Sequence, residues 1–404
     1  MEIRTITDAE VEPWVTAMNE GFLSHAEEGE AEFRRPAIDL DRTLAAFDGD
    51  KVVGTYRSWA TELTLPGGDT LPAAAVTNVT VTPTHRRRRL LTEMITRDLR
   101  ESQQRGEALS VLIASEYPIY GRYGYGPATE HVKLEVKRHA ATFRRPPSGT
   151  VELLTPDEVR PHMRAVYDAH RRANPGEIDR RDRRLDREAG IIEMPGKDKP
   201  HPYQAICRDR DGNVTGYVRY RVNNEWEGRV SDVRIEVREL WAPTPEAQAL
   251  LWSFCLGMDW VVGVTGLDRG PDDLLPSLLE DARAVRQSER ADFLWTRILD
   301  VPTALGARSY LHDTSFVLEV HDPLGFTEGR YRVTIDGGVA NCEPTDDEPD
   351  VAVGVAVLSS VLLGGWSLLW YAEAGLVDAP DRTVLTEVDT AFRWHRRPWC
   401  ATWF

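Results

Sequence analysis

The stretch IYGRYGYGPAT at 119–129 holds three tyrosines and three glycines. A tyrosine keeps its proton at neutral pH, because its hydroxyl has a pKa of about 10, and it can therefore donate that proton to a leaving group. The glycines Gly121, Gly124 and Gly126 are expected to supply turn conformations that other residues adopt poorly. The residue types alone leave two interpretations open: an aromatic turn that packs, or a turn that presents one hydroxyl for proton transfer.

A second chemical signal is the basic run THRRRRLL at 84–91, in which Arg86–Arg89 precede an apolar helical pattern. A helix N-terminus offers unpaired backbone N–H groups and about half a positive charge, so it binds anions, phosphate in particular. Arginines are electrostatically unfavourable at that position unless a bound anion offsets their charge. The run therefore indicates a phosphate site, and a solvated basic turn is the alternative that the local sequence leaves open.

The elements around these residues follow from the hydrophobic pattern. The run AAAVTNVTVTP at 73–83 is β-branched and mostly apolar, which predicts a buried strand that stops at Pro83. A helix ended by Gly106 and a second buried strand, ALSVLIAS at 108–115, follow. The helix is indicated by apolar residues at helical spacing, namely Leu90, Leu91, Met94, Ile95 and Leu99. Strand, helix and strand in this order form a βαβ unit, whose strands pair in parallel.

The same order of elements recurs later in the chain. The residues at 79–94 can be superposed on RELWAPTPEAQALLWSF at 238–254, so that Pro83 and Pro243 coincide. In the second copy, EAQA at 246–249 replaces the four arginines. A true repeat would mean that the second copy kept the fold and lost the anion site, and chance similarity of two strand-to-helix turns is the alternative.

The chain also divides into segments. RRPPSG at 144–149 interrupts any periodicity and indicates a linker, after which a hairpin turns at DGN. A third segment begins near Val301 and contains the alternating strands SFVLEVHD and GRYRVTIDGGVANCEPT. The uncharged stretch 351–372 is expected to split into a buried strand (351–358) and a core helix (359–372), although its length also allows a membrane span.

Taken together, VTNVTVTP, HRRRRLL, VLIAS and IYGRYGYG resemble the GNAT superfamily of N-acetyltransferases. More specifically, VTPTHRRR, ASE before IYGRYGYGPAT, and the late RILDVPTALGARSY resemble the enhanced intracellular survival (Eis) family over nearly the whole chain. The resemblance implies a mixed α/β and α+β fold in three parts. These are a catalytic GNAT domain at 1–147, a second, degenerate GNAT-like domain at 148–290, and a sterol-carrier-protein-like α+β domain at 291–404.

The resemblance also implies roles for individual residues. Tyr120 matches the general acid, and Phe404 matches a C-terminal residue whose free carboxylate is the general base, while Tyr123 and Tyr125 are expected to pack. Acetyl-CoA would be bound by three segments, with no metal: Val79, Thr80 and Val81; Arg86, Arg87, Arg88, Arg89, Leu90, Leu91 and Thr92; and Ser115 and Glu116. Where the family pattern has glycine, this chain has Arg89, so the loop path or the cofactor affinity is expected to differ.

The activity implied is acetylation of the amines of aminoglycoside-like polyamines, with one active site per chain, in a cytoplasmic homohexamer. Protein or peptide lysines are the alternative acceptors. A non-catalytic, GNAT-derived binding protein, whose third domain holds an apolar ligand, is the alternative of another class, and the Arg89 departure favours it most.

Composition narrows these possibilities. A net charge of −16 argues against general nucleic-acid affinity and suits a cationic substrate. The four scattered cysteines lack CxxC spacing, which indicates reduced thiols, and the N-terminus MEIRTITDAE has no apolar segment typical of a signal peptide. We expect structural or solvating roles for His85 and for the charged helix face at 179–188. The glutamates Glu27, Glu28, Glu30 and Glu32 are expected to form a solvated surface, and lining the path of a cationic substrate is the alternative.

Overall fold

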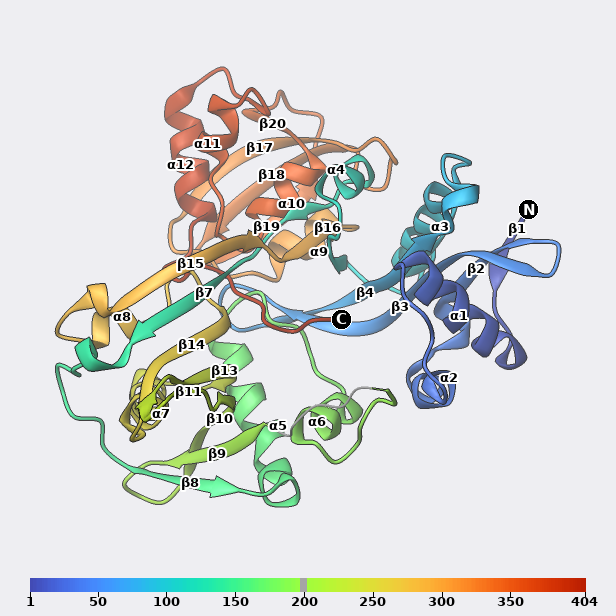
Figure 1. Ribbon diagram of the computed structural model, residues 1–404. Coiled ribbons are helices and arrows are strands. Elements are labelled where there is room, and N and C mark those ends of the chain that lie inside the picture. Colours follow the sequence, from blue (N-terminus) through green and yellow to red (C-terminus); the bar gives the residue numbers. More distant parts are fainter. Residues whose placement is uncertain (197–201) are drawn as a thin grey trace.

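Three β-sheets organise the chain (Figure 1). The computed structural model describes residues 1–196 and 202–404. Two of the sheets have seven strands and the third has five. Figure 1 shows the C-terminus at the centre of the molecule, beside the long strands β3 (Lys51–Thr64) and β4 (Thr70–Val81), rather than at the edge of the third sheet.

The first sheet contains the predicted βαβ unit. Its strand order is β1 (Glu2–Thr5), β2 (Thr43–Asp48), β3, β4, β5 (Leu109–Ile113), β16 (Leu294–Ile298) and β6 (Gly126–Pro127). Strands β4 and β5 pair in parallel and are joined by helix α3 (Leu90–Gln104), which confirms the prediction. Four of the five apolar residues predicted for this helix are buried, and Leu91 is half-buried. The other helices of this part are α1 (Val11–Gly21), α2 (Glu30–Arg34) and α4 (Tyr117–Tyr120).

Strands β4 and β5 separate before they end. Their parallel pairing runs from Ala73–Leu109 to Val76–Leu112 and then stops, although β4 continues to Val81. Asn78 has a left-handed backbone, with φ of 54°, and lies at a register shift between β3 and β4, which marks a β-bulge. Beyond Val76, β4 has a strand partner only on its β3 side within the described chain. Its other edge therefore presents backbone groups to the gap between β4 and β5.

The second sheet repeats this topology. Its strand order is β15 (Val285–Asp292), β7 (Glu130–Lys137), β14 (Val261–Arg269), β13 (Val233–Trp241), β10 (Val214–Asn223), β9 (Tyr203–Arg208) and β8 (Thr150–Leu154). Strands β13 and β14 pair in parallel around helix α7 (Pro245–Gly257), which confirms the predicted repeat of strand, helix and strand. The remaining elements are helices α5 (Pro156–Ala173), α6 (Asp182–Ala189) and α8 (Leu275–Leu278) and the hairpin β11 (Trp226–Glu227) and β12 (Val230–Ser231).

The two copies differ in the connection that precedes the helix, and here the predicted superposition is wrong. Helix α7 begins at Pro245, directly after the short connection 242–244, whereas 82–89 separate β4 from α3. The residues at 246–249 are therefore the first turns of a helix and not a counterpart of the arginine loop. The side chain of Thr244 caps this helix by accepting a hydrogen bond from the Ala247 amide at 3.2 Å. The second copy thus lacks the loop itself, in addition to its charge.

Two strands cross the predicted domain boundaries. Strand β7 lies within the predicted first domain (1–147) but pairs with β14 and β15 in the second sheet. Strand β16 lies within the predicted third domain (291–404) but pairs with β5 and β6 in the first sheet. The domain boundaries at 147 and 290 therefore remain predictions. Each of the two seven-stranded sheets includes a strand from another predicted domain.

The third sheet has the order β19 (Val339–Pro344), β18 (Gly329–Asp336), β17 (Thr314–His321), β20 (Val351–Gly354) and β21 (Val377–Asp378). The antiparallel strands predicted around DGG are confirmed. The predicted strand 351–358 and helix 359–372 are wrong in detail, because the strand ends at Gly354 and two short helices follow, separated near Gly364, whose φ is 81°. The helices of this part are α9 (Val301–Gly306), α10 (Val355–Val361), α11 (Leu368–Glu373) and α12 (Arg382–Phe392). Within the described ranges, every helix is too short or too polar to cross a bilayer.

Candidate active site

All the residues that the sequence assigns to cofactor binding line one cavity of about 680 Å³. The cavity lies against the end of β4, the loop 82–89, the first turn of α3 and the segment that follows β5. Its lining includes Val79–Val81, Arg86–Thr92, Ser115 and Glu116, and Tyr120 and Tyr123 face it as well. Segments far apart in the sequence are brought together because β4 and β5 are neighbours whose C-terminal ends meet at the same edge of the sheet.

The arginine loop keeps a turn conformation that usually requires glycine. Arg89, the residue before α3, has φ of 62° and ψ of 13°, and Arg87 also has a positive φ of 65°. A side chain makes this left-handed conformation less favourable by about 1–2 kcal/mol. The sequence left open whether Arg89 changes the loop path, and the structure shows that Arg89 takes up the left-handed conformation that glycine would favour there.

We therefore expect Arg89→Gly to raise the free energy of unfolding by about 1 kcal/mol, because glycine adopts a positive φ without the side-chain penalty. Arg86→Gly is the matched control: Arg86 has φ of −60° and ψ of 157°, so glycine there adds only unfolded-state entropy and lowers stability. Melting temperatures of the two variants test this. Equal destabilisation by both would contradict the strain assigned to Arg89.

Tyr120 is the buried tyrosine at the junction of β5 and the cavity. It ends helix α4 and is 5% exposed. Burial raises the pKa of its hydroxyl to about 12, the negative charge of Glu116 acts in the same direction, and a hydrogen bond with Ser115 opposes them. The hydroxyl therefore stays protonated at neutral and mildly alkaline pH. Burial thus moves this hydroxyl above the ordinary tyrosine pKa of about 10.

The other two tyrosines pack, as predicted. The Tyr123 hydroxyl lies 2.9 Å from Thr92 Oγ1, and the Tyr125 hydroxyl lies 2.6 Å from Ser110 Oγ. Both rings belong to the core around α3. Their hydroxyls are thus engaged with side chains of α3 and β5, which leaves Tyr120 as the candidate for chemistry.

The glycines of this motif serve different purposes. Gly124 has φ of 84°, so it supplies a turn conformation as predicted. Gly126 lacks a positive φ and is needed for another reason: a Cβ atom would lie 2.0 Å from the Ala356 carbonyl oxygen on α10. Gly121 begins a single 3₁₀ turn, but its φ of −56° suits any residue and a Cβ there would meet nothing within 4 Å, so that turn does not require glycine.

A buried ion pair from distant segments fixes the motif. Arg297 on β16 donates to the Tyr123 carbonyl at 2.8 Å and to Asp322 Oδ2 at 2.6 Å. Burial disfavours the charge of Asp322, but Arg297 outweighs it and lowers the pKa of that carboxyl. Arg297 lies in the motif RILDVPTALGARSY but had no predicted role, and Asp322 lies in no predicted site. No local pattern could have shown that they meet behind the tyrosine motif.

The C-terminal segment is docked between the first two sheets. Buried Glu177 accepts hydrogen bonds from the Ala401 amide at 2.7 Å and from Thr402 Oγ1 at 2.9 Å. Arg180 donates to Thr402 Oγ1 at 2.8 Å, and its ion pairs with Glu188 and Glu239, at 2.7 and 2.6 Å, hold it in place. The ring of Phe404 packs edge-on against Trp59 on β3, with ring centroids 5.1 Å apart. The last residue is therefore fixed in space, as the aromatic terminus predicted.

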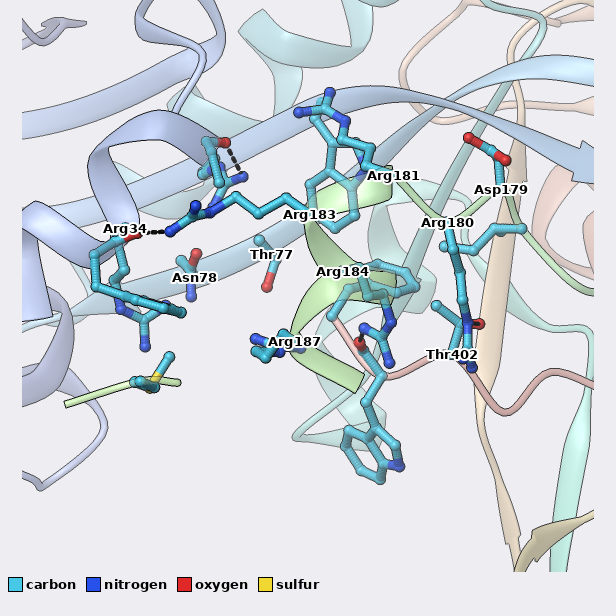
Figure 2. Close-up of a pocket in the computed structure, with 18 of the residues that line it drawn as sticks. Arg34, Thr77, Asn78, Asp179, Arg180, Arg181, Arg183, Arg184, Arg187 and Thr402 are labelled. Atoms are coloured by element: carbon cyan, nitrogen blue, oxygen red, sulfur yellow. Dashed lines mark hydrogen bonds between the residues drawn. The ribbon is translucent and has the colours of Figure 1, made fainter. Parts of the chain in front are cut away.

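Phe404 and Tyr120 line a common cavity of about 350 Å³ in the gap between β4 and β5. This connecting cavity shares Val79, Ser115 and Tyr120 with the cofactor cavity. On its other side it shares Thr77, Asn78, Trp403 and Phe404 with a cavity of about 210 Å³ that is rich in arginine, drawn in Figure 2. The three cavities therefore adjoin and form one path. Tyr120, the predicted acid, lies where the cofactor cavity meets the connecting cavity, and Phe404, the predicted base, lies where the connecting cavity meets the third.

The weaker candidates take different positions relative to these cavities, and His85 lines the cofactor cavity. His85 bonds Thr82 and Thr84 through Nδ1 and lies 3.2 Å from Asp48, so it holds the loop as expected. The glutamates at 27–32 do not line these three cavities. The charged run 179–188 does, which corrects its interpretation as a solvated helix face. Among the described residues there is no cluster of side chains suited to a metal ion, and the four cysteines are free thiols.

Comparisons with known proteins agree with this arrangement. Residues 2–128 and 176–298 each match a family model described as an acetyltransferase (GNAT) domain, and residues 301–401 match a sterol carrier protein domain. An uncharacterized N-acetyltransferase of Streptomyces avermitilis is 38% identical over 412 residues, which cover 100% of this chain and 99% of the relative. N-acetyltransferase Eis of Mycobacterium tuberculosis is 36% identical over 373 residues, which cover 89% of this chain and 88% of the relative.

The chain belongs to the Eis family of N-acetyltransferases. Among solved structures, Eis1 from Mycobacterium abscessus superposes with a TM-score of 0.90 at 33% identity and covers 100% of both chains. A GCN5-related N-acetyltransferase from Anabaena variabilis has a TM-score of 0.86 at 19% identity over 100% of both chains, which shows the shared fold alone. This Eis-family chain is an acetyltransferase built from two GNAT domains and a sterol carrier protein domain, so the predicted fold class is confirmed.

Proposed function

We propose that this Eis-family enzyme transfers an acetyl group from acetyl-CoA to an amine, at one active site per chain in the first domain. The observation that carries the proposal is the path of three cavities, in which Tyr120 and the chain terminus Phe404 line the connecting cavity. Two reactants held in the outer cavities would meet between a buried hydroxyl and a carboxylate. Such an arrangement supplies proximity as well as proton transfer.

The cofactor cavity fits acetyl-CoA in its charge and in its backbone. Arg86–Arg89 are exposed, and none of the four forms an ion pair with another described residue, so their charges are available to a pyrophosphate. Helix α3 has no side-chain cap, which leaves its first N–H groups directed at the same place. The free edge of β4 beyond Val76 can pair with the amides of a pantetheine arm. Acetyl-CoA supplies the acetyl group as a thioester.

Phe404 is proposed to accept a proton from the amine, and Tyr120 is proposed to stabilise the leaving thiolate. The amine arrives mostly as an ammonium ion, since alkylamines titrate at a pKa of about 10, and the Phe404 carboxylate takes its proton. The Tyr120 hydroxyl, the predicted general acid, donates a hydrogen bond to the departing thiolate. Its raised pKa makes full transfer to a thiolate in water unfavourable, because a free thiol has a pKa of about 8.5, so the hydroxyl acts mainly by stabilising the negative charge on sulfur in a buried site.

The identity of the acceptor and the assembly remain proposals. The expectation of an aminoglycoside-like polyamine, with protein lysines as the alternative, rests on the family resemblance, and the charges of the third cavity bear on it below. A homohexamer in the cytoplasm is likewise carried over from the family. The alternative of a non-catalytic binding protein loses its best argument, because Arg89 keeps the loop in its left-handed conformation.

Thiol release from acetyl-CoA across a panel of amines tests the activity, and calorimetry tests the site. We expect one CoA per chain, because the second copy has neither the loop nor its arginines. The double variant Arg87→Gln/Arg88→Gln should bind CoA about 10- to 100-fold more weakly, the range for losing charge-assisted hydrogen bonds. Arg210→Gln, at an exposed arginine of the second domain, is the control. Two equivalent sites per chain, or unchanged affinity in the double variant, would contradict the proposed site.

A further inference from the structure

The cavity that remains for the acceptor is lined by seven arginines (Figure 2). They come from three parts of the chain that the fold brings together: α2, β3, and the segment that leads into and includes α6. The arginines are Arg34, Arg57, Arg180, Arg181, Arg183, Arg184 and Arg187. In Figure 2 the labelled arginines of α6 and of its preceding segment lie around the same space as Thr77 and Asn78 of β4. Of the other two cavities on the path, the cofactor cavity is also lined by arginines, whereas the lining of the connecting cavity contains none.

Three of the seven are neutralised by carboxylates. Arg34 pairs with Glu30 at 2.6 Å. Arg180 pairs with Glu188 and Glu239, and Arg184 pairs with Glu188 at 2.6 Å. The first pair lies within α2, and the others hold α6 and the C-terminal segment, where Glu188 is shared by Arg180 and Arg184 and Glu239 also pairs with Arg219.

The other four are not neutralised. Arg57 donates to the Ala37 carbonyl oxygen at 2.5 Å, and Arg183 donates to the Phe33 carbonyl oxygen at 2.6 Å. Arg181 makes only a long contact to a carbonyl oxygen, at 3.5 Å. Neither these three nor Arg187 forms an ion pair with any described residue. Carbonyl oxygens satisfy a donor without cancelling its charge, so the positive charge faces the cavity.

The negative charge available nearby is small. Asp179 is the one side-chain carboxylate of the lining, and it is engaged by Arg164 at 3.1 Å and by Arg171 at 3.8 Å. Phe404, whose carboxylate is the proposed base, also belongs to this lining. Burial lowers the pKa of Arg57 to about 10, and the positive charges of Arg181 and Arg34 lower it further, while the nearby carboxylate of Asp39 opposes them. The net charge of −16 of the whole chain does not describe this cavity, because charges beyond about 8 Å are screened.

We infer that the acceptor is a small amine that also carries an oxyanion, a carboxylate or a phosphate, which the unpaired arginines bind while the amine reaches Phe404. This inference rests on the proposed function and assigns the substrate class of the same site. Planar guanidinium groups bind both kinds of oxyanion through paired N–H donors. A polycation would meet four arginines that have no ion pair, which opposes its binding. The rings of Phe33, Trp59 and Phe404 form the apolar part of the wall and can contact the body of the acceptor.

Matched pairs of amines test the inference by thiol release from acetyl-CoA. Glucosamine 6-phosphate is compared with glucosamine, phenylalanine with phenylalaninamide, and kanamycin serves as the polycation. The first pair reports phosphate and the second reports carboxylate, so the two sources of the oxyanion are told apart. We expect the anionic member of at least one pair to have a kcat/KM about 10- to 100-fold higher, the range for charge-assisted hydrogen bonds. A preference for kanamycin, or for the neutral member of both pairs, would overturn the inference.

Variants and a binding measurement separate this inference from the proposed function. Arg187→Gln and Arg183→Gln should each reduce the preference about tenfold, and Arg210→Gln should leave it unchanged. Calorimetry of glucosamine 6-phosphate, glucosamine, phenylalanine and phenylalaninamide in the presence of CoA measures acceptor binding without catalysis. Absence of thiol release with every amine would refute the proposed function. The binding measurement would then decide whether the cavity prefers the anionic member of each pair. Equal binding within each pair, or a preference unaffected by Arg187→Gln, refutes the anionic acceptor even in an active enzyme.

Discussion

Replacing Tyr120 by phenylalanine is expected to lower turnover by about 10²- to 10⁴-fold and to leave CoA binding unchanged. The variant removes one hydroxyl from a ring that is 5% exposed, so the packing around it is kept. Without the hydroxyl, the thiolate departs with no hydrogen bond in a buried site, where an unpaired charge is unfavourable. Steady-state thiol release gives the turnover, and calorimetry gives the affinity for CoA.

Tyr123→Phe is the matched control. Tyr123 lines the same cavity, but its hydroxyl bonds Thr92, so its loss should change turnover less than tenfold. A drop of similar size in both variants would point to a packing effect, and full activity in Tyr120→Phe would remove the role assigned to this hydroxyl.

The pH dependence of turnover follows from the same residue. Tyr120 must carry its proton to act, and it does so below its pKa, which burial raises to about 12. The amine must lose its proton, and the fraction that has done so rises with pH up to about 10. Turnover of the parent enzyme should therefore rise from pH 7 to 10 without a descending limb. A fall in turnover that begins near pH 9, in protein that remains folded, would place the acid at another group.

Adding one glycine after Phe404 is expected to reduce turnover steeply in a protein that folds and binds CoA normally. The added residue moves the terminal carboxylate by about 3.5 Å, more than a hydrogen bond tolerates. The segment before it stays docked, because Glu177 and Arg180 hold Ala401 and Thr402 independently of the last residue. The loss should be smaller at higher pH, where more of the amine is already deprotonated.

Phe404→Leu separates the carboxylate from the ring. This variant keeps the chain terminus in position and removes the aromatic contact to Trp59. It should retain most of the activity that the glycine extension loses. Thiol release over pH 7 to 9.5, with melting temperature as the folding control, compares the two. Equal rates in the parent and extended proteins would show that the base lies elsewhere, with Glu116 as the next candidate.

The sequence by itself determined the local elements and the cofactor side of the site. Strand β4, helix α3 and strand β5 follow from hydrophobic spacing within about 45 residues, and periodicity of that kind is a property of neighbouring positions. The residues predicted to bind acetyl-CoA line one cavity because the ends of adjacent parallel strands must meet at one edge of a sheet. The hydrophobic pattern did not determine where a helix begins. Helix α7 starts closer to its preceding strand than α3 does, because the caps and turns before the two helices differ.

Only the tertiary structure decided what surrounds the reacting groups. Arg297 bonds the tyrosine motif across 174 residues of chain, and Arg180 bonds Thr402 beneath the C-terminus across 222 residues. Such contacts leave no period or spacing in the sequence. The run at 179–188 was interpreted as a solvated face, because alternating charges are typical of one. Whether an arginine is neutralised or left facing a cavity depends on which carboxylates the fold places beside it, and that arrangement exists only once α6, β3 and the chain terminus have packed together.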